Sequence, residues 1–282
     1  MAEDTNTRAL VLGGGGVTGI AWEIGVLHGL TEAGVDLGLA DAVIGTSAGA
    51  FTGAAVAGGH PIAGLYAAQF EPNTTEVSAA MPDELLLLWF GAYEEGGADP
   101  AAVGRAFGAI ARANPEPVPM ARRREAVAGR LLSTDFPPTL RVTATDADTG
   151  ELHVLDHTSG LSLTDAVTAS GAVPGVWPLL EAGGHTWIDG GMVSPTNARQ
   201  ADGFDAVLVL APIPYAYGKI PGVADDVEAL RAHGAKAILI PPDDESIEAI
   251  GPNLFDPERR GIVAEAGRAQ GARIASEVLA IW

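Results

Sequence analysis

Two glycine-rich junctions constrain the fold most, because each follows a strand-like apolar run and precedes a helical pattern. Residues 8–12 (RALVL) lead into GGGGVTG at 13–19, and a helical pattern follows from Ile20 to Glu32. Residues 41–44 lead into GTSAG at 45–49, and a run of small residues follows. A repeated order of strand, turn and helix is typical of an α/β protein with a parallel sheet.

The rest of the chain alternates between helical and strand-like segments. Helical segments divided by prolines and glycines occupy residues 61–132, with no strand pattern among them. Further along we expect two strands joined by a tight turn, a helix, and then three more strands with helices between and after them. The expected strands are 140–145, 151–155, 186–188, 206–210 and 237–240, and the expected helices are 163–170 and 227–232. A final helix begins at Asp256-Pro257.

Composition excludes several classes of function. The 16 basic and 36 acidic residues give a net charge of -20, which disfavours binding to nucleic acid. The absence of cysteine excludes disulfides, thiolate metal sites and a cysteine nucleophile. No apolar run is long enough for a membrane span, and the acidic N-terminus MAEDTNTR lacks the regions of a signal peptide, so we expect a cytoplasmic protein.

The second junction has the pattern of a nucleophile elbow. In G-x-S-x-G a strained turn projects the serine, and the flanking glycines allow neighbouring backbone to approach closely. Here Ser47 stands between Gly45-Thr46 and Ala48-Gly49. The alternative is an ordinary helix start, with Ser47 as its capping residue.

The first junction admits two interpretations. Its pattern Gly14-x-Gly16-x-x-Gly19 resembles a dinucleotide-binding turn, but such a site needs an acidic residue after the second strand, where this chain has Gly45-Thr46-Ser47. The same turn beside a nucleophile supplies N–H groups that stabilise an oxyanion. The donors that we expect are those of Gly15, Gly16, Val17 and Thr18, with Ala48 in addition.

A serine nucleophile also needs a base. A triad in α/β-hydrolase order requires a late histidine, and His233 is the only one that follows Asp189. His233 stands at the end of a helix, where a capping role explains it, and His185 lies four residues before Asp189. Asp189 itself precedes Gly190 and Gly191, a pattern that also suits a structural turn.

Four motifs in order resemble the patatin-like phospholipases: the glycine-rich turn, GTSAG, ASGAVPGVWP at 169–178 and DGG at 189–191. The resemblance spans about residues 8–211. It implies a three-layer α/β/α sandwich with a central, mostly parallel sheet, in one domain over 1–282 with a helical insert at about 61–135 and C-terminal strands and a helix at about 206–282.

The resemblance also implies a function. Ser47 is expected to be the nucleophile and Asp189 the general base of a Ser-Asp dyad that cleaves lipid esters: phospholipid, lysophospholipid or acylglycerol. We expect no cofactor and no metal ion. The expected partners are a lipid or acyl-ester substrate and, transiently, a membrane or micelle.

One departure from the family pattern leaves an alternative function open. Relatives carry a basic residue just before the last glycine of the turn, where this chain has Thr18. A lipid-binding or regulatory protein with little catalysis is therefore the second hypothesis. The apolar residues 85–90 (LLLLWF) fit either a core helix or one that lines an acyl pocket or forms a lid that meets lipid.

Two other motifs have competing interpretations. Asp146-Ala147-Asp148 resembles the start of a calcium loop, but the spacing of Gly150 and His157 favours a hairpin turn instead. The basic run Arg122-Arg123-Arg124 suits a solvated helix face better than an anion site, because Glu125 follows it.

Overall fold

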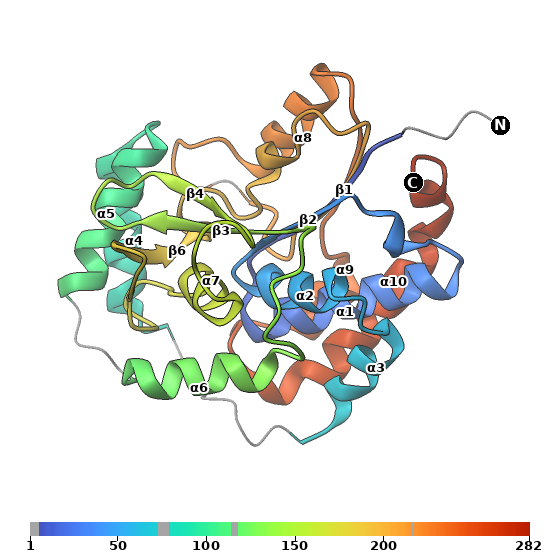
Figure 1. Cartoon of the computed structure of the whole chain (residues 1–282), viewed down its shortest axis with the longest axis horizontal. Coiled ribbons are helices and arrows are strands. Elements are labelled where there is room, and N and C mark those ends of the chain that lie inside the picture. Colours follow the sequence, from blue (N-terminus) through green and yellow to red (C-terminus); the bar gives the residue numbers. More distant parts are fainter. Residues whose placement is uncertain (1–5, 73–78, 80, 114–117, 216) are drawn as a thin grey trace.

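The computed structural model describes residues 6–72, 79, 81–113, 118–215 and 217–282, and an eight-stranded mixed sheet lies at its centre (Figure 1). The strand order is β5-β6-β3-β2-β1-β7-β8, and β4 pairs with β3 outside this path. The strands are β1 Arg8–Leu12, β2 Ala42–Thr46, β3 Leu140–Asp146, β4 Leu152–Leu155, β5 Leu180–Ala182, β6 His185–Asp189, β7 Ala206–Leu210 and β8 Lys236–Ile240.

The five strands β3, β2, β1, β7 and β8 run parallel, and β4, β5 and β6 form an antiparallel end. Parallel neighbours place their carboxyl ends at one edge of the sheet. Leu12 of β1 pairs with Gly45 of β2, so the two glycine-rich junctions leave the sheet side by side.

Helices cover both faces of the sheet, with α1, α2, α9 and α10 on one side and α8 on the other (Figure 1). The longer elements are α1 Gly16–Glu32, α2 Ala48–Ala57, α3 Ile62–Ala67, α4 Asp83–Gly96, α5 Pro100–Ala113, α6 Met120–Arg130, α7 Leu163–Ser170, α8 Val223–Ala232, α9 Asp244–Ile250 and α10 Arg260–Leu279. Short 3₁₀ turns occupy 37–39, 68–70, 190–192, 198–201 and 257–259. None of the helices in the described ranges is long and apolar enough to cross a bilayer.

Alternation along the central strands divides the core between the two faces. Leu10 and Leu12 of β1 pack in the large cluster under α1 and α10, whereas Ala9 and Val11 pack toward α8. All five residues of β7 are buried, with Leu208 and Leu210 on the first face. Strands buried on both faces are what a sheet between two helical layers requires. The expected α/β/α architecture with a mostly parallel sheet is confirmed.

The elements largely follow the expected ranges, with four differences. Helix α1 begins at Gly16 rather than Ile20, and α8 begins at Val223 rather than Val227. Strand β5 and helix α9 were not expected: β5 has only three residues, and α9 follows its N-cap Asp243 closely after β8. In the described part of 61–135 all regular structure is helical, while residues 114–117 of the proline run lie outside the described residues.

Candidate active site

Ser47 occupies a strained turn between β2 and α2. Its φ of 54° and ψ of -113° are uncommon for a residue with a side chain. Glycine is required on both sides, because a Cβ at Gly49 would lie 2.0 Å from the Leu12 carbonyl oxygen and one at Gly45 would lie 2.5 Å from the Gly49 oxygen. Ser47 also donates its backbone N–H to Ser170 Oγ at 2.8 Å. The turn therefore has the geometry of a nucleophile elbow.

The glycine-rich turn lies beside Ser47, and some of its N–H groups are already occupied. Gly14 donates to the Pro195 carbonyl at 2.8 Å, and Thr18 donates to the Leu254 carbonyl at 3.1 Å. The expectation that Thr18 offers its N–H to an oxyanion is therefore wrong. Gly15 and Gly16 have no backbone or side-chain acceptor among the described residues, and the same holds for Val17 and Ala48. These four N–H groups are the donors that remain.

The side chain of Thr18 takes part in the same attachment. Its Oγ1 donates to the Leu254 carbonyl at 3.2 Å, and the residue is fully buried. Gly16, with a φ of +62°, packs so closely on this segment that a Cβ would lie 2.5 Å from the Leu254 oxygen. Thr18 thus fixes the turn against the segment before α10 and brings no charge to the site.

Asp189 ends β6 and is 1 % exposed. Its Oδ1 accepts the N–H of Gly191 at 2.7 Å, so the DGG motif forms a capped 3₁₀ turn. Burial raises the pKa of Asp189 to about 7, although side-chain interaction with Ser47, the Gly191 N–H and the charge of Arg123 all favour the ionised form. A carboxyl with a pKa near neutrality is suited to accept a proton.

Ser47 and Asp189 share the wall of one cavity of about 570 Å³, together with Gly14, Gly15 and Gly16. Most of the remaining wall is apolar and comes from α4 and the segment before it, from the segments after α7 and β7, from the turn at 190–192 and from the segment before α10. These residues include Met81, Leu86, Trp89, Phe90, Tyr93, Val173, Met192, Ile213, Leu254 and Phe255. A chain of methylene groups fits such a wall better than a polar ligand does.

The apolar run of helix α4 is divided between the core, the cavity wall and the surface. Leu85 is buried with Val173 and Trp177, as a core residue would be. Leu86 and Phe90 line the cavity. Leu87 is 69 % exposed, and Phe90 is also largely exposed, so an apolar surface adjoins the cavity.

Asn197 and Ser170 support the site, although the motifs gave no role to either. Asn197 is 2 % exposed and left-handed, with a φ of 52°. Its Nδ2 donates to Thr46 Oγ1 and Thr143 Oγ1, both at 3.1 Å, and to the Gly190 carbonyl at 3.2 Å. One amide therefore connects the elbow, β3 and the DGG turn. The signal available in the sequence was a polar residue shortly after DGG.

The basic run on α6 does not form a solvated face throughout, so that expectation is wrong for Arg123. Arg122 and Arg124 are exposed and pair with Glu125 and Asp165. Arg123 is 5 % exposed, and its guanidinium lies 4.3 Å from the centroid of the Trp177 ring. Helical geometry explains the difference, because consecutive residues point in directions about 100° apart.

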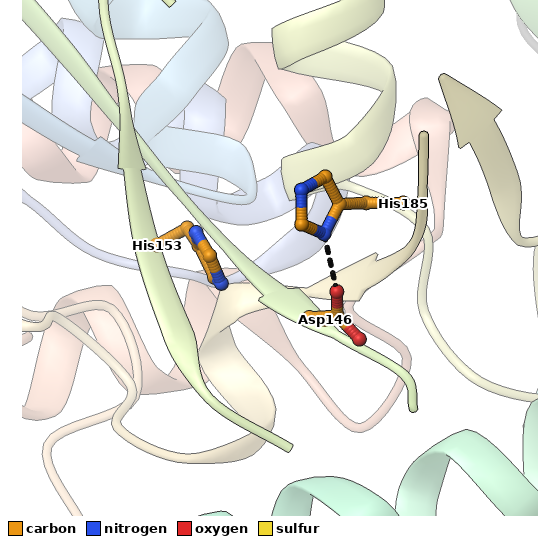
Figure 2. Close-up of side chains that lie close together, drawn as sticks. All are labelled: Asp146, His153 and His185. Atoms are coloured by element: carbon orange, nitrogen blue, oxygen red, sulfur yellow. Dashed lines mark hydrogen bonds and ion pairs between the residues drawn. The ribbon is translucent and has the colours of Figure 1, made fainter. Parts of the chain in front are cut away.

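The histidines considered as bases lie elsewhere. His233 caps α8 and meets Asp202 at 2.9 Å, and neither it nor His185 lines the cavity with Ser47. His185 points toward Asp146, with Nδ1 2.6 Å from Oδ2 (Figure 2). Asp146 Oδ1 accepts the N–H groups of residues 148 and 149, as a hairpin turn requires.

With His153, these two side chains form a group of metal-ligand type in the described part of the chain. One donor atom from each of Asp146, His153 and His185 lies within 4.8 Å of the others. They come from β3, β4 and β6 (Figure 2). The rings of His153 and His185 also pack on Trp187. Both oxygens of Asp146 take part in hydrogen bonds within the protein.

Fold and site together define a class: α/β proteins in which a serine elbow opens at the carboxyl edge of a mixed sheet. A family model, patatin-like phospholipase, matches residues 10–202. The chain therefore belongs to the patatin-like phospholipase family, a family of lipid hydrolases.

Similar solved structures include VipD from Legionella pneumophila, with 14 % identity and a TM-score of 0.49 over 96 % of this chain and 67 % of VipD. They also include ExoU of the Pseudomonas aeruginosa type III secretion system in complex with SpcU, with 19 % identity and a TM-score of 0.47 over 97 % of this chain. The chain spans about half of ExoU, 53 %. No match is found among curated protein sequences.

Proposed function

We propose that the protein is a serine acyl hydrolase that cleaves carboxylic ester bonds of lipids, with Ser47 as nucleophile and Asp189 as general base. The observation that carries this proposal is their position in one wall of an apolar cavity of about 570 Å³. The strained elbow and the buried carboxyl support it, because strain and shifted pKa values gather at catalytic sites.

The proposed reaction has two steps. Ser47 Oγ attacks the ester carbonyl carbon while Asp189 takes the hydroxyl proton, and the N–H groups of Gly15, Gly16 and Ala48 hold the oxyanion. Collapse of the tetrahedral intermediate breaks the bond to the alcohol, which leaves with the proton from Asp189. Water then attacks the acyl-enzyme, Asp189 takes a proton from it, and the fatty acid departs as Ser47 regains its proton.

The cavity and α4 suggest how a lipid binds. The acyl chain lies along Leu86, Trp89 and Phe90 in this account, and burial contributes roughly 0.8 kcal/mol for each methylene. The exposed side chains of Leu87 and Phe90 contact a micelle or membrane transiently. We also retain the proposals that residues 1–282 form one domain and that the protein acts in the cytoplasm.

Substitution of the dyad tests the proposal. Ser47→Ala should lower the kcat for p-nitrophenyl acyl esters by about 10³-fold or more, and Asp189→Asn should do the same, because each removes a group that acts in the transition state. Ser159→Ala provides the control, since Ser159 is exposed in a turn with Asp156. Unchanged hydrolysis in a folded Ser47→Ala variant would refute the assignment.

A lipid-binding protein without turnover is the second candidate, and Thr18 favours it because the turn carries no cation. It predicts that lipid copurifies with the protein while Ser47 stays inert toward acylating reagents. Turnover that depends on Ser47 would exclude this candidate.

A further inference from the structure

Arg123 is a buried cation close to the nucleophile. It comes from α6 in the helical insert, and its Nη2 donates to the Gly171 carbonyl at 3.2 Å at the end of α7. The ring of Trp177 covers the guanidinium. Arg123 Nε has no acceptor, and among the described residues no carboxylate lies within ion-pair distance of the side chain.

Such a group is costly to bury without an ion-pair partner, and the charge of Asp189, which lies beyond ion-pair distance, acts on it in the opposite direction to burial. Buried charges in proteins are as a rule paired or hydrogen-bonded throughout, because desolvation penalises the ionised form. Burial lowers the pKa of Arg123 to about 10, so the side chain remains cationic at neutral pH. One carbonyl and one aromatic face satisfy it only in part. An anion that enters the site would complete its interactions.

The cation faces a space that includes Ser47. A cavity of about 20 Å³ is lined by Ser47, Arg123, Arg130, Trp177, Val173 and Phe255, and it has room for a single oxygen atom or water-sized group. Val173, Phe255 and Ser47 also line the large apolar cavity. Ser47 therefore lines both a large apolar cavity and a small cavity whose wall includes two arginines.

The small cavity has part of its wall in common with a larger one. A third cavity of about 360 Å³ shares Val17, Phe51 and Arg130 with the small one, and Arg260 and the acidic residue Glu71 also line it. Three arginines and one carboxylate thus line the two cavities, in a chain that has 16 basic residues and a net charge of -20. The space of about 360 Å³ is large enough for a polar head group.

We propose that Arg123 determines specificity by binding an anionic group on the alcohol side of the scissile ester, so that the protein prefers acyl esters that carry a phosphate near the ester over neutral esters of the same chain length. This inference rests on the proposed function. Thr18 stands where relatives have a basic residue, so the glycine-rich turn brings no positive charge to the site. Arg123 supplies a positive charge from the helical insert instead. The phosphate oxygen accepts from Nε in a charge-assisted hydrogen bond.

Two ligands that lack an ester test the binding of the anion without any need for turnover. Octyl phosphate and 1-octanol have the same chain, and calorimetry measures the affinity of each for the wild-type protein. At pH 7.5 octyl phosphate should bind at least about tenfold more tightly, as a charge-assisted hydrogen bond in a buried site implies. The net charge of -20 would by itself favour octanol, so equal affinities would overturn the inference.

Variants of neighbouring arginines localise the effect. Arg123→Gln should weaken the binding of octyl phosphate about tenfold to a hundredfold and leave the affinity for 1-octanol unchanged. Arg123→Lys should retain part of the preference for octyl phosphate. Arg122→Gln, on the exposed face of the same helix, should change neither affinity. An equal loss in Arg122→Gln, or no loss in a folded Arg123→Gln variant, would contradict the assignment.

Two further measurements complete the test. The first distinguishes a lipid phosphate from free phosphate, and the second distinguishes failure of this inference from failure of the proposed function. Inorganic phosphate should bind more weakly than octyl phosphate, and equal binding would overturn the preference for a lipid. For turnover, Arg123→Gln should lower kcat/KM for 1-octanoylglycerol 3-phosphate about tenfold or more relative to 1-octanoylglycerol. Absence of all turnover alongside the predicted binding would refute the proposed function and leave the anion site standing.

Discussion

At the scale of single residues, burial gives Asp189 its chemistry. The carboxyl has one hydrogen bond to the Gly191 N–H and an interaction with Ser47, yet burial still raises its pKa to about 7. An exposed aspartate has a pKa of about 3.9 and would be a weak base. The same burial that prepares Asp189 to accept a proton makes its ionised form costly to the fold.

The raised pKa of Asp189 predicts a pH-dependent cost. Between about pH 4 and pH 7 the folded protein holds this proton and the unfolded chain does not, so the contribution of Asp189 to stability falls as the pH rises. A shift of about three units corresponds to roughly 4 kcal/mol. Asp189→Asn should therefore gain stability relative to wild type over this window, by up to a few kcal/mol at pH 8, in urea unfolding.

Asp148→Asn is the control for that comparison, because Asp148 is an exposed aspartate that pairs with Arg112. The difference in stability between Asp148→Asn and wild type should not show the change between pH 4 and pH 7 that is expected for Asp189→Asn. A difference between Asp189→Asn and wild type that stays constant from pH 4 to pH 8 would show that Asp189 does not titrate in this way.

Sequence reasoning reached the residues that stand in short motifs and missed those placed by long-range contacts. Ser47 and Asp189 lie in patterns that suffice to suggest their roles, and the structure puts both in one cavity wall. Ser170 meets Ser47 across 123 residues, and Asn197 meets Thr46 across 151. The expectation of a solvated face failed for Arg123, because the sequence does not show that this side chain packs on Trp177 and donates to the Gly171 carbonyl.

At the scale of elements, α4 shows why a run of apolar residues did not determine one role. A helix turns about 100° per residue, so six consecutive apolar residues reach every face. Leu85 enters the core, Leu86 faces the cavity and Leu87 faces outward. The run therefore contributes to the core, to the cavity wall and to the exposed surface in turn.

Helix α4 should limit the length of the acyl chain. Leu86→Trp places a larger side chain in the cavity wall and should lower kcat/KM for a C16 ester relative to a C4 ester by about tenfold, as overpacking would. Leu87→Trp, on the exposed face, is the matched control and should leave that ratio unchanged. Equal effects of both substitutions on the C16 to C4 ratio would place the chain elsewhere.

Strands with strong flanking signals were predictable, and short or closely spaced elements were not. β1, β2 and β7 follow from apolar runs that end at turn residues. β5 has three residues, too few for a period-2 pattern, and it exists because β6 offers a partner. The mostly parallel sheet was expected from the family resemblance, but the order of its strands was not predicted, since periodicity does not encode which strands pair.

At the scale of the whole molecule, the sheet brings distant motifs together. The turns after β1 and β2 leave the same edge, and β6 joins that edge by antiparallel pairing with β3, where Asp189 lies opposite Ala144. Thus residues 14–16, 47 and 189 share one cavity wall. The insert closes the site from the outside with the apolar face of α4 and the buried cation of α6.

The central claim is that Ser47 is a nucleophile served by Asp189, and reaction with a fluorophosphonate probe tests it most directly. Mass mapping should locate the label, gained with loss of fluoride, on Ser47 alone. The labelling rate should rise with pH through about 7, as Asp189 loses its proton, and Asp189→Asn should label far more slowly. A folded protein that stays unlabelled, or one labelled at another serine, would contradict the account.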